Sequence, residues 1–295
     1  MNRTLVVALA VSAVAAGLFY GRRTSDQSTP PPSPAVAAPI GATLLEGLGD
    51  YSFPVTSSHP EVQRWFDQGL MLTYGFNHDA AERTYLKATE LDPECAMCWW
   101  GAALVLGPHV NGGMDPANNQ KAWQRLQRAI ELAPRASERE QAFIRALSAR
   151  FAENPPDDRR PLDEAYAKAT GQLVAERPDD LDAAAFHAEA LMDLQPWDYY
   201  DEQLQPKGNT GEIVSILESV MARDPDHAGG GGELDLWVRR MRGGRGNGEG
   251  KREHQLAEHG QLSLMTIENS DFSAVRQGRQ QARRQNRSPV TGWLR

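Results

Sequence analysis

Between about residues 60 and 225 the apolar residues recur every three or four positions, which is the period of amphipathic helices. The pattern predicts helices over 60–72, 78–91, 96–106, 119–132, 137–151, 161–176, 181–194 and 211–222. These helices form four pairs, and each pair ends at a proline: Pro93, Pro134, Pro178 and Pro225. Proline stops a helix because its ring removes a backbone donor and clashes with the preceding turn. The sequence therefore predicts an all-α fold built from helix pairs.

Large and small side chains occupy fixed positions within the first two pairs. These residues are Trp65, Gly69, Ala81, Tyr85, Ala88 and Pro93 in the first pair, and Trp99, Ala102, Ala103, Ala122, Leu126, Ala129 and Pro134 in the second. Small residues let two helices approach closely, and the large ones fill the space between neighbouring pairs. One pair cannot bury its apolar face alone, so such units gain stability by stacking. A generic Ala-rich helical bundle is the alternative.

The residues of the first pair resemble the tetratricopeptide (TPR) repeat family, whose unit is a helix–turn–helix of about 34 residues. The resemblance implies an all-α, TPR-like solenoid of about four repeats. Successive prolines lie further apart than one such unit, so the later repeats are expected to carry inserted loops. The expected repeat domain covers residues 46–228.

The segment from Glu46 to His227 is also similar to a bacterial group of exported or membrane-associated TPR proteins of undefined function. The motifs that carry this similarity are Gly75–His78, Cys98–Ala102, Leu106–Asn111 and Asp193–Asp198. Proteins of this group generally continue into further helical repeats after the position of His227. This chain departs from the pattern there, so any function that needs the later repeats would be lost.

The first 23 residues predict export or membrane anchoring by an N-terminal hydrophobic helix. Arg3 precedes an apolar run at 5–20, which as a helix is about 24 Å long, shorter than the roughly 30 Å hydrocarbon core of a bilayer. This length favours a signal peptide, whereas Arg22 and Arg23 oppose translocation and favour an uncleaved anchor. The expected location is the periplasm or the inner membrane.

Two further segments flank the repeat domain. Residues 24–45 are rich in proline and are expected to form a semi-rigid linker. Residues 229–295 are rich in Gly, Arg and Gln, and we expect a poorly ordered tail; a shifted reading frame and an RNA-binding segment are the alternatives. The net charge is −8, yet basic residues outnumber acidic ones from Ala228 onward, so the repeat domain is acidic. An acidic surface argues against nucleic acid as a partner of that domain.

The expected function is that of a non-enzymatic scaffold that binds a protein or peptide partner. In a TPR stack the first helix of each pair lines a concave groove. The corresponding positions in this chain are Gln63, Phe66, Leu70, Thr73, Met97, Trp100, Leu104, Gly107, Asp182, Ala185, Glu189 and Met192. An apolar, aromatic groove suits capture of a peptide or helix, unless inserted loops or the tail cover it. The motifs of hydrolases, kinases and nucleotide-binding proteins are missing from the sequence, so no enzymatic activity is expected.

Cys95 and Cys98 form the sharpest chemical motif, a C-x-x-C pair. In an oxidising compartment a local disulfide is the simplest interpretation, and reduced packing cysteines or a metal or redox pair are the alternatives. A c-type haem site is excluded, because a tryptophan stands where that signature requires histidine. His78 and His109 are the nearest imidazoles. With Met97 added, the soft thiolate and thioether ligands would favour Cu(I) over zinc. A periplasmic copper-binding or thiol-redox protein is therefore the alternative function.

Several local features complete the prediction. Ser137 and Glu140 have the spacing of a capping box at a helix start. The connector at 195–200 is unusually aromatic for a loop, which favours folding back onto the core over contact with a ligand. His187 is expected to be a buried histidine with its hydrogen bonds satisfied, and His227 a capping or loop residue.

Overall fold

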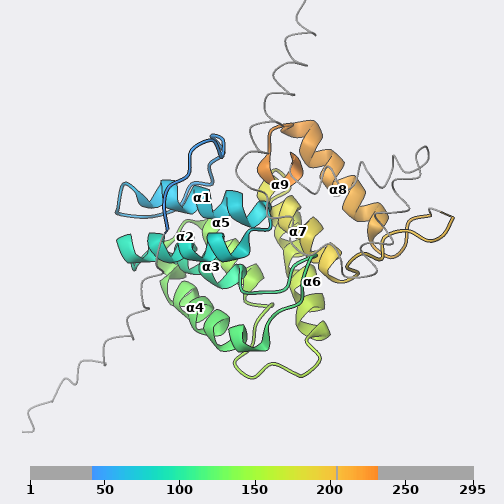
Figure 1. Cartoon of the computed structure of the whole chain (residues 1–295), viewed down its shortest axis with the longest axis horizontal. Helices are drawn as coiled ribbons and strands as arrows, with labels where there is room; N and C mark the ends of the chain where they lie inside the picture. The colour runs from blue at the N-terminus through green and yellow to red at the C-terminus, as the bar shows by residue number, and fades with distance from the viewer. Residues whose placement is uncertain (1–41, 204, 232–295) are drawn as a thin grey trace, which may run out of the picture. The chain divides into compact units, whose positions relative to one another are not determined.

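The computed structural model describes residues 42–203 and 205–231 of the 295-residue chain, and all of them belong to one compact unit (Figure 1). This part of the chain is all-α, with loops and two isolated β-bridges between the helices. The α-helices are α1 (Val62–Tyr74), α2 (His78–Leu91), α3 (Ala96–Leu104), α4 (Asn119–Leu132), α5 (Glu138–Leu147), α6 (Arg160–Glu176), α7 (Leu181–Asp193), α8 (Thr210–Arg223) and α9 (Ala228–Gly231). Each predicted helix has a counterpart among α1 to α8, and its ends coincide with the predicted ones or differ from them by a few residues. The predicted N-terminal hydrophobic helix and nearly all of the predicted tail lie outside the described residues.

Local chemistry sets the helix ends, as the sequence predicted. The Ser137 hydroxyl accepts from the Glu140 amide at 3.3 Å, and a Glu140 carboxylate oxygen accepts from the Ser137 amide at 2.7 Å. This is the capping box at the start of α5. Asp180 caps α7 by accepting from the Ala183 amide at 3.2 Å. Such caps satisfy backbone donors that have no partner inside the helix.

Glycine lets helices α1, α2 and α3 pack closely around one aromatic ring. The Tyr85 ring on α2 fits against Gly69 of α1 and Gly101 of α3. A Cβ atom would lie 2.7 Å from this ring at Gly69 and 2.4 Å at Gly101, both far inside van der Waals contact. Successive helices contact one another along the whole described chain. The small residues in the sequence therefore mark places where helices approach closely, and the large ones fill the space between them.

The first helices of the pairs share an aromatic interior. The Trp100 ring of α3 lies 5.9 Å from the Phe143 ring of α5 and 5.5 Å from the Phe186 ring of α7, centre to centre. The Tyr74 ring of α1 lies 5.3 Å from that of Phe186. Helix α9 contacts both α1 and α7, so the end of the described chain returns to its beginning.

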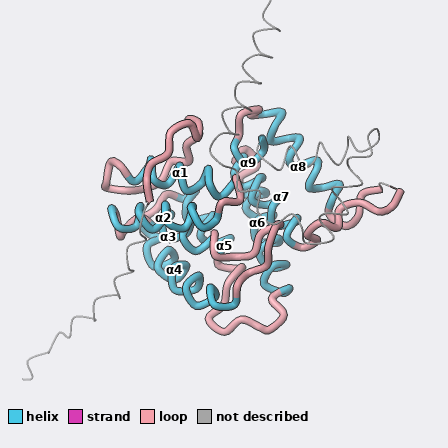
Figure 2. The backbone as a smooth tube through the Cα atoms, viewed as in Figure 1, coloured by secondary structure: helices cyan, strands magenta, loops and turns pink. Residues whose placement is uncertain are grey.

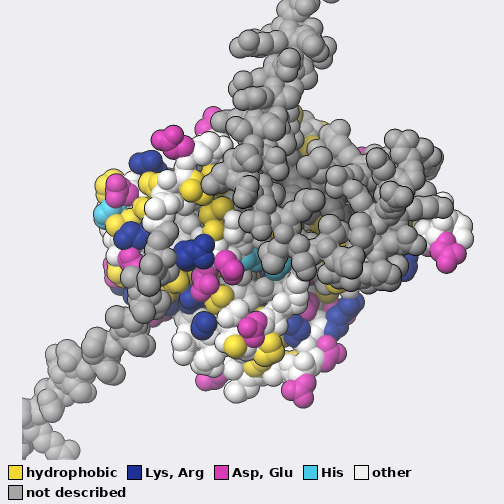
Figure 3. Space-filling model, viewed as in Figure 1, with side chains coloured by type: hydrophobic (Ala, Val, Ile, Leu, Met, Phe, Trp, Pro, Cys, Tyr) yellow, Lys and Arg dark blue, Asp and Glu magenta, His cyan; other side chains and the backbone are white. Residues whose placement is uncertain are grey.

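The longer loops lie within the pairs, between α3 and α4, α5 and α6, and α7 and α8 (Figure 2). In the aromatic connector Tyr199 is 3% exposed, whereas Trp197 is 38% exposed. Acidic and basic side chains are interspersed over the face shown in Figure 3. Within residues 42–203 and 205–231, no helix combines the length and the apolar character that crossing a membrane requires.

Candidate functional site

Most of the side chains predicted to line an open groove lie in the protein interior, whereas Gln63 is half-buried. Their exposed fractions are 0% for Phe66, Leu70 and Met97, 2% for Trp100 and Met192, 3% for Leu104, 5% for Thr73 and 9% for Glu189. These positions therefore do not border an open groove, and their contact with a partner stays a prediction. The first helices turn these faces toward one another, because mutual burial removes their apolar surface from water.

A non-helical stretch, residues 51–58, covers this interior and is named here the leading segment. Its Phe53 is 1% exposed. The centre of the Phe53 ring lies 5.6 Å from that of Phe66 on α1 and 5.2 Å from that of Phe143 on α5. The guanidinium carbon of Arg139 lies 3.7 Å from the centre of the same ring. The leading segment thus takes the place that an external ligand of the groove was expected to fill.

Two side chains one turn apart on α1 hold the main chain of the leading segment. The Phe53 amide donates to Asp67 Oδ1 at 3.0 Å, and the Val55 amide donates to Gln63 Oε1 at 3.0 Å. Gln63 Nε2 donates to the Phe53 carbonyl at 2.7 Å. Burial raises the pKa of Asp67, an effect that these hydrogen bonds oppose. The contacts recognise backbone atoms, which every amino acid except proline presents in full.

Carboxylates hold the second half of the leading segment. Glu140 on α5 accepts from the Thr56 amide at 2.7 Å and from the Thr56 hydroxyl at 2.6 Å. Asp92, just after α2, accepts from the Ser57 hydroxyl at 2.5 Å and from the Ser58 amide at 3.0 Å. Burial tends to raise the pKa of Asp92, but the hydrogen bonds from Ser57 and Ser58 bring it below its ordinary value. The leading segment is therefore bonded to three helical elements.

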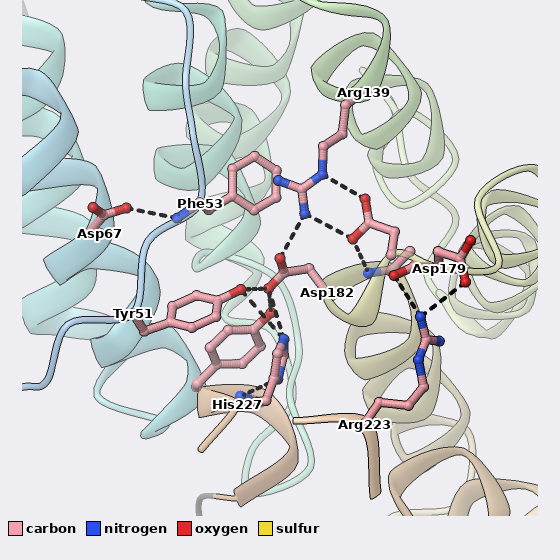
Figure 4. A network of polar contacts seen from close by, with 12 residues as sticks. Tyr51, Phe53, Asp67, Arg139, Asp179, Asp182, Arg223 and His227 are labelled. Atoms are coloured by element: carbon pink, nitrogen blue, oxygen red, sulfur yellow. Dashed lines mark hydrogen bonds and ion pairs between the residues drawn. The ribbon is translucent and has the colours of Figure 1, made fainter. Parts of the chain in front are cut away.

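Asp182 of α7 is the centre of a buried polar network (Figure 4). Its carboxylate accepts from the hydroxyls of Tyr51 and of Tyr74, the latter at 2.6 Å, and pairs with Arg139 Nη2 at 2.7 Å. His227 Nε2 lies 3.5 Å from Asp182 Oδ1. Burial acts to raise the pKa of Asp182, but the hydrogen bonds from His227, Tyr51 and Tyr74 together lower it. The carboxylate is therefore charged at neutral pH.

The network joins parts of the chain that are distant in sequence. His227 follows α8 and is 2% exposed. The Gly229 amide donates to His227 Nδ1 at 3.1 Å, so in the neutral imidazole the proton is on Nε2, which faces Asp182. Sequence reasoning placed His227 in a cap or loop and gave Tyr51 no role. The one indication was Asp182 itself, a carboxylate at a position predicted to line the concave groove.

A depression of about 500 Å³ opens beside this network. It is lined by Arg139, Glu176, Arg177, Pro178, Asp179, Asp180 and Leu181. Arg139 forms a bidentate pair with Asp180, at 2.6 and 2.8 Å, and Arg223 Nη2 pairs with Asp179 at 3.1 Å. Asp180 therefore has two roles: it caps α7, and it holds the guanidinium that lies over Phe53.

The cysteine pair and the histidine pair singled out in the sequence each form a contact of their own. Cys95 and Cys98 are joined by a disulfide, and both residues are 0% exposed. The rings of His78 and His109 lie 4.3 Å apart, centre to centre, and both pack against Phe76. Burial, together with the charges of His109 and Arg150, lowers the pKa of His78 to about 3. Among the described residues no group of three or more His, Cys, Asp and Glu side chains could hold a metal ion.

Glu189, predicted to face the groove, belongs to a second buried polar cluster. Arg150 Nη2 pairs with Asp193 at 2.6 Å and donates to the Pro108 carbonyl at 2.5 Å. Its guanidinium carbon lies 4.4 Å from the centre of the Tyr166 ring. Burial raises the pKa of Glu189, against the opposing effect of the Arg150 charge. Burial likewise raises the pKa of Asp193, and the Arg150 charge opposes this effect too.

No family model, curated protein or solved structure matches the chain. Function must therefore be inferred from the geometry of the site. The clearest chemical feature of that geometry is the way the surrounding side chains bind the leading segment. Carboxylate and amide side chains hold its main chain, and an aromatic pocket beneath a guanidinium holds its Phe53 ring.

Proposed function

We propose that the protein is a non-enzymatic TPR-type scaffold that binds a peptide or a non-helical segment of a partner protein on the face formed by α1, α3, α5 and α7. The repeated helix pairs support a TPR-type solenoid. So does the close fit of Gly69 and Gly101 against Tyr85, which is the small-against-large arrangement expected of such repeats.

The observation that carries the proposal is the way the leading segment is held. Gln63 and Asp67 bond to the backbone of Phe53 and Val55, not to their side chains. Backbone recognition combined with a pocket for one side chain is how proteins bind peptides of variable sequence. The same face therefore suits a segment that belongs to another protein.

The proposed setting is the periplasm or the inner membrane surface, reached through residues 1–23. A disulfide between Cys95 and Cys98 suits such an oxidising compartment. The alternative, a copper-binding or thiol-redox protein, would require this disulfide to open, because thiolates are what bind soft metals. Nucleic acid is not proposed as a partner of the acidic repeat domain.

Site-specific photo-crosslinking in the source cells tests the scaffold function. A photoreactive residue replaces Ser52, which is exposed on the leading segment, and in a separate control replaces Ile130 on α4, which is 38% exposed. We expect the variant with the photoreactive residue at position 52 to form a crosslinked adduct with a partner. The variant at position 130 should form much less of it. Absence of any adduct, or equal adducts from both positions, would contradict the proposal.

A further inference from the structure

We propose that the leading segment is an exchangeable internal ligand, which a partner displaces with a segment that carries an aromatic residue and, three positions later, a serine or threonine. This inference rests on the proposed function, and it adds the chemistry of the partner and the means by which its binding is regulated. The evidence is the set of side chains that contact the leading segment.

The aromatic requirement follows from the pocket around Phe53. Two aromatic rings, Phe66 and Phe143, surround it, and the Arg139 guanidinium lies over its face. Asp180 and Asp182 fix the guanidinium in that position. A cation held over a ring favours an aromatic side chain over an aliphatic one of similar size. The pocket therefore selects Phe, Tyr or Trp at this position of the partner.

The hydroxyl requirement follows from Glu140. Its two carboxylate oxygens accept from the amide and the hydroxyl of Thr56, at 2.7 and 2.6 Å. An ionised carboxylate can only accept hydrogen bonds, so it binds a side chain that donates one and repels an acidic side chain. Asp92 accepts from Ser57 and Ser58 in the same manner. A partner segment with Ser or Thr here would reproduce these bonds. One with Asp or Glu would lose the two hydroxyl bonds and bring a second negative charge close to the carboxylate.

The leading segment has the properties of a ligand that is tethered to its own binding site. It contains no helix or strand, and Ser52, Pro54, Thr56 and Ser58 are exposed while Phe53 is buried. Its end lies only a few residues before α1, so its effective concentration at the site is on the order of millimolar. The tethered leading segment therefore covers the aromatic interior and excludes weak ligands. A partner segment that binds more tightly displaces it.

A peptide-binding experiment on the full chain tests the exchange. The probe is a fluorescent peptide of residues 50–58, and its control carries alanine in place of phenylalanine. The F53A variant empties the aromatic pocket, so we expect it to bind the probe at least about 10-fold more tightly than the unmodified chain. The alanine peptide should bind neither protein. F151A, which removes a buried aromatic ring outside the leading segment, should behave like the unmodified chain.

If F53A retains its helical circular dichroism but does not bind the probe, the proposal is overturned. Hydrogen exchange on the unmodified chain gives an independent test in case F53A does not fold. The amides of Phe53, Val55 and Thr56 should exchange at least about 10-fold faster than those of Phe66 and Leu70 in α1. Equal rates would show that the leading segment opens only when the whole domain unfolds, and would also overturn the proposal. A partner adduct from position 52 combined with either negative result would leave the scaffold function intact.

Discussion

Arg139 and Asp182 form an ion pair of 2.7 Å in which the side chains are 26% and 6% exposed. The pair links α5 to α7, and the same guanidinium lies over the Phe53 ring. One side chain therefore connects the third and fourth helix pairs with the leading segment. The consequence is that the pocket for Phe53 depends on a charge network that reaches to the end of the described chain.

Replacing Arg139 by methionine should lower the free energy of unfolding by about 3 kcal/mol, because it leaves the buried carboxylate of Asp182 without its charged partner. Urea unfolding followed by circular dichroism measures this change. The matched control is Arg145→Met on the same helix. Arg145 pairs with Glu176 at the surface, with side chains 62% and 59% exposed, so its loss should cost less than about 1 kcal/mol. Equal losses in the two variants would contradict the importance of the buried pair.

Alanine at Gly101 and alanine at Gly211 should change stability in opposite directions. At Gly101 the added methyl group collides with the Tyr85 ring at 2.4 Å, and overpacking of this kind costs about 1–3 kcal/mol. At Gly211 in α8 nothing lies within 4 Å of the added atom, so the lower entropy of the unfolded chain should stabilise the fold by about 0.5 kcal/mol. Thermal denaturation of the two variants gives the signs. A stabilised G101A would show that Tyr85 does not pack as described.

Removing the disulfide should destabilise the domain, and we expect the reduced cysteines to bind no metal ion. The double variant Cys95→Ser, Cys98→Ser opens a very short loop, so we expect a loss of about 2 kcal/mol in unfolding free energy. Thiol titration of the unfolded, non-reduced protein should find no free cysteine. Elemental analysis after reduction tests the copper alternative: stoichiometric copper that disappears in the double variant would support a metal-binding protein over a scaffold.

His78 should make the fold less stable as the pH falls. Its pKa is about 3 in the folded chain against an ordinary value of 6.5, so only the unfolded chain takes up this proton between those two values. Each pH unit lost in that window therefore costs up to about 1.4 kcal/mol from this residue. His78→Gln removes the effect, and its unfolding free energy should fall less steeply from pH 6.5 to pH 4.

The comparison of the two proteins isolates His78 from other groups. Glu189, whose raised pKa has the opposite effect on acidification, is present in both proteins. The difference between the two unfolding curves therefore reports the imidazole alone. Parallel dependence on pH would show that His78 is not buried in its neutral form.

Much of the fold could be predicted from local patterns. The predicted segments 78–91 and 119–132 coincide with α2 and α4, and the capping box at Ser137 is present. His187 is buried with a partner, as expected: its Nδ1 lies 3.0 Å from the Thr170 hydroxyl. These features depend on residues a few positions apart, so the helical period and the side chains at helix ends are sufficient to find them.

The candidate site could be predicted only in part. Phe66 and Trp100 were predicted to lie on the concave face of the first helices and to border an open groove. The leading segment covers Phe66, and it has no period or motif that marks it as a cover. The opposing helices do have a helical period, but that period does not tell which helix faces which. Tyr51 and Asp182 are separated by 131 positions, and such a distant pair leaves no local pattern in the sequence.

The sequence by itself determined the helices, their ends, the glycine and alanine positions where helices touch, and the cysteine spacing that a disulfide needs. Only the tertiary structure decided that the first helices pack against one another and that Phe53 fills the interior. It also decided that His227, near the end of the described chain, contacts Tyr51 near its beginning. The reason is physical. Helix formation depends on neighbours within one or two turns, whereas the curvature of a stack of helices depends on how side chains distant in the chain fill a common space.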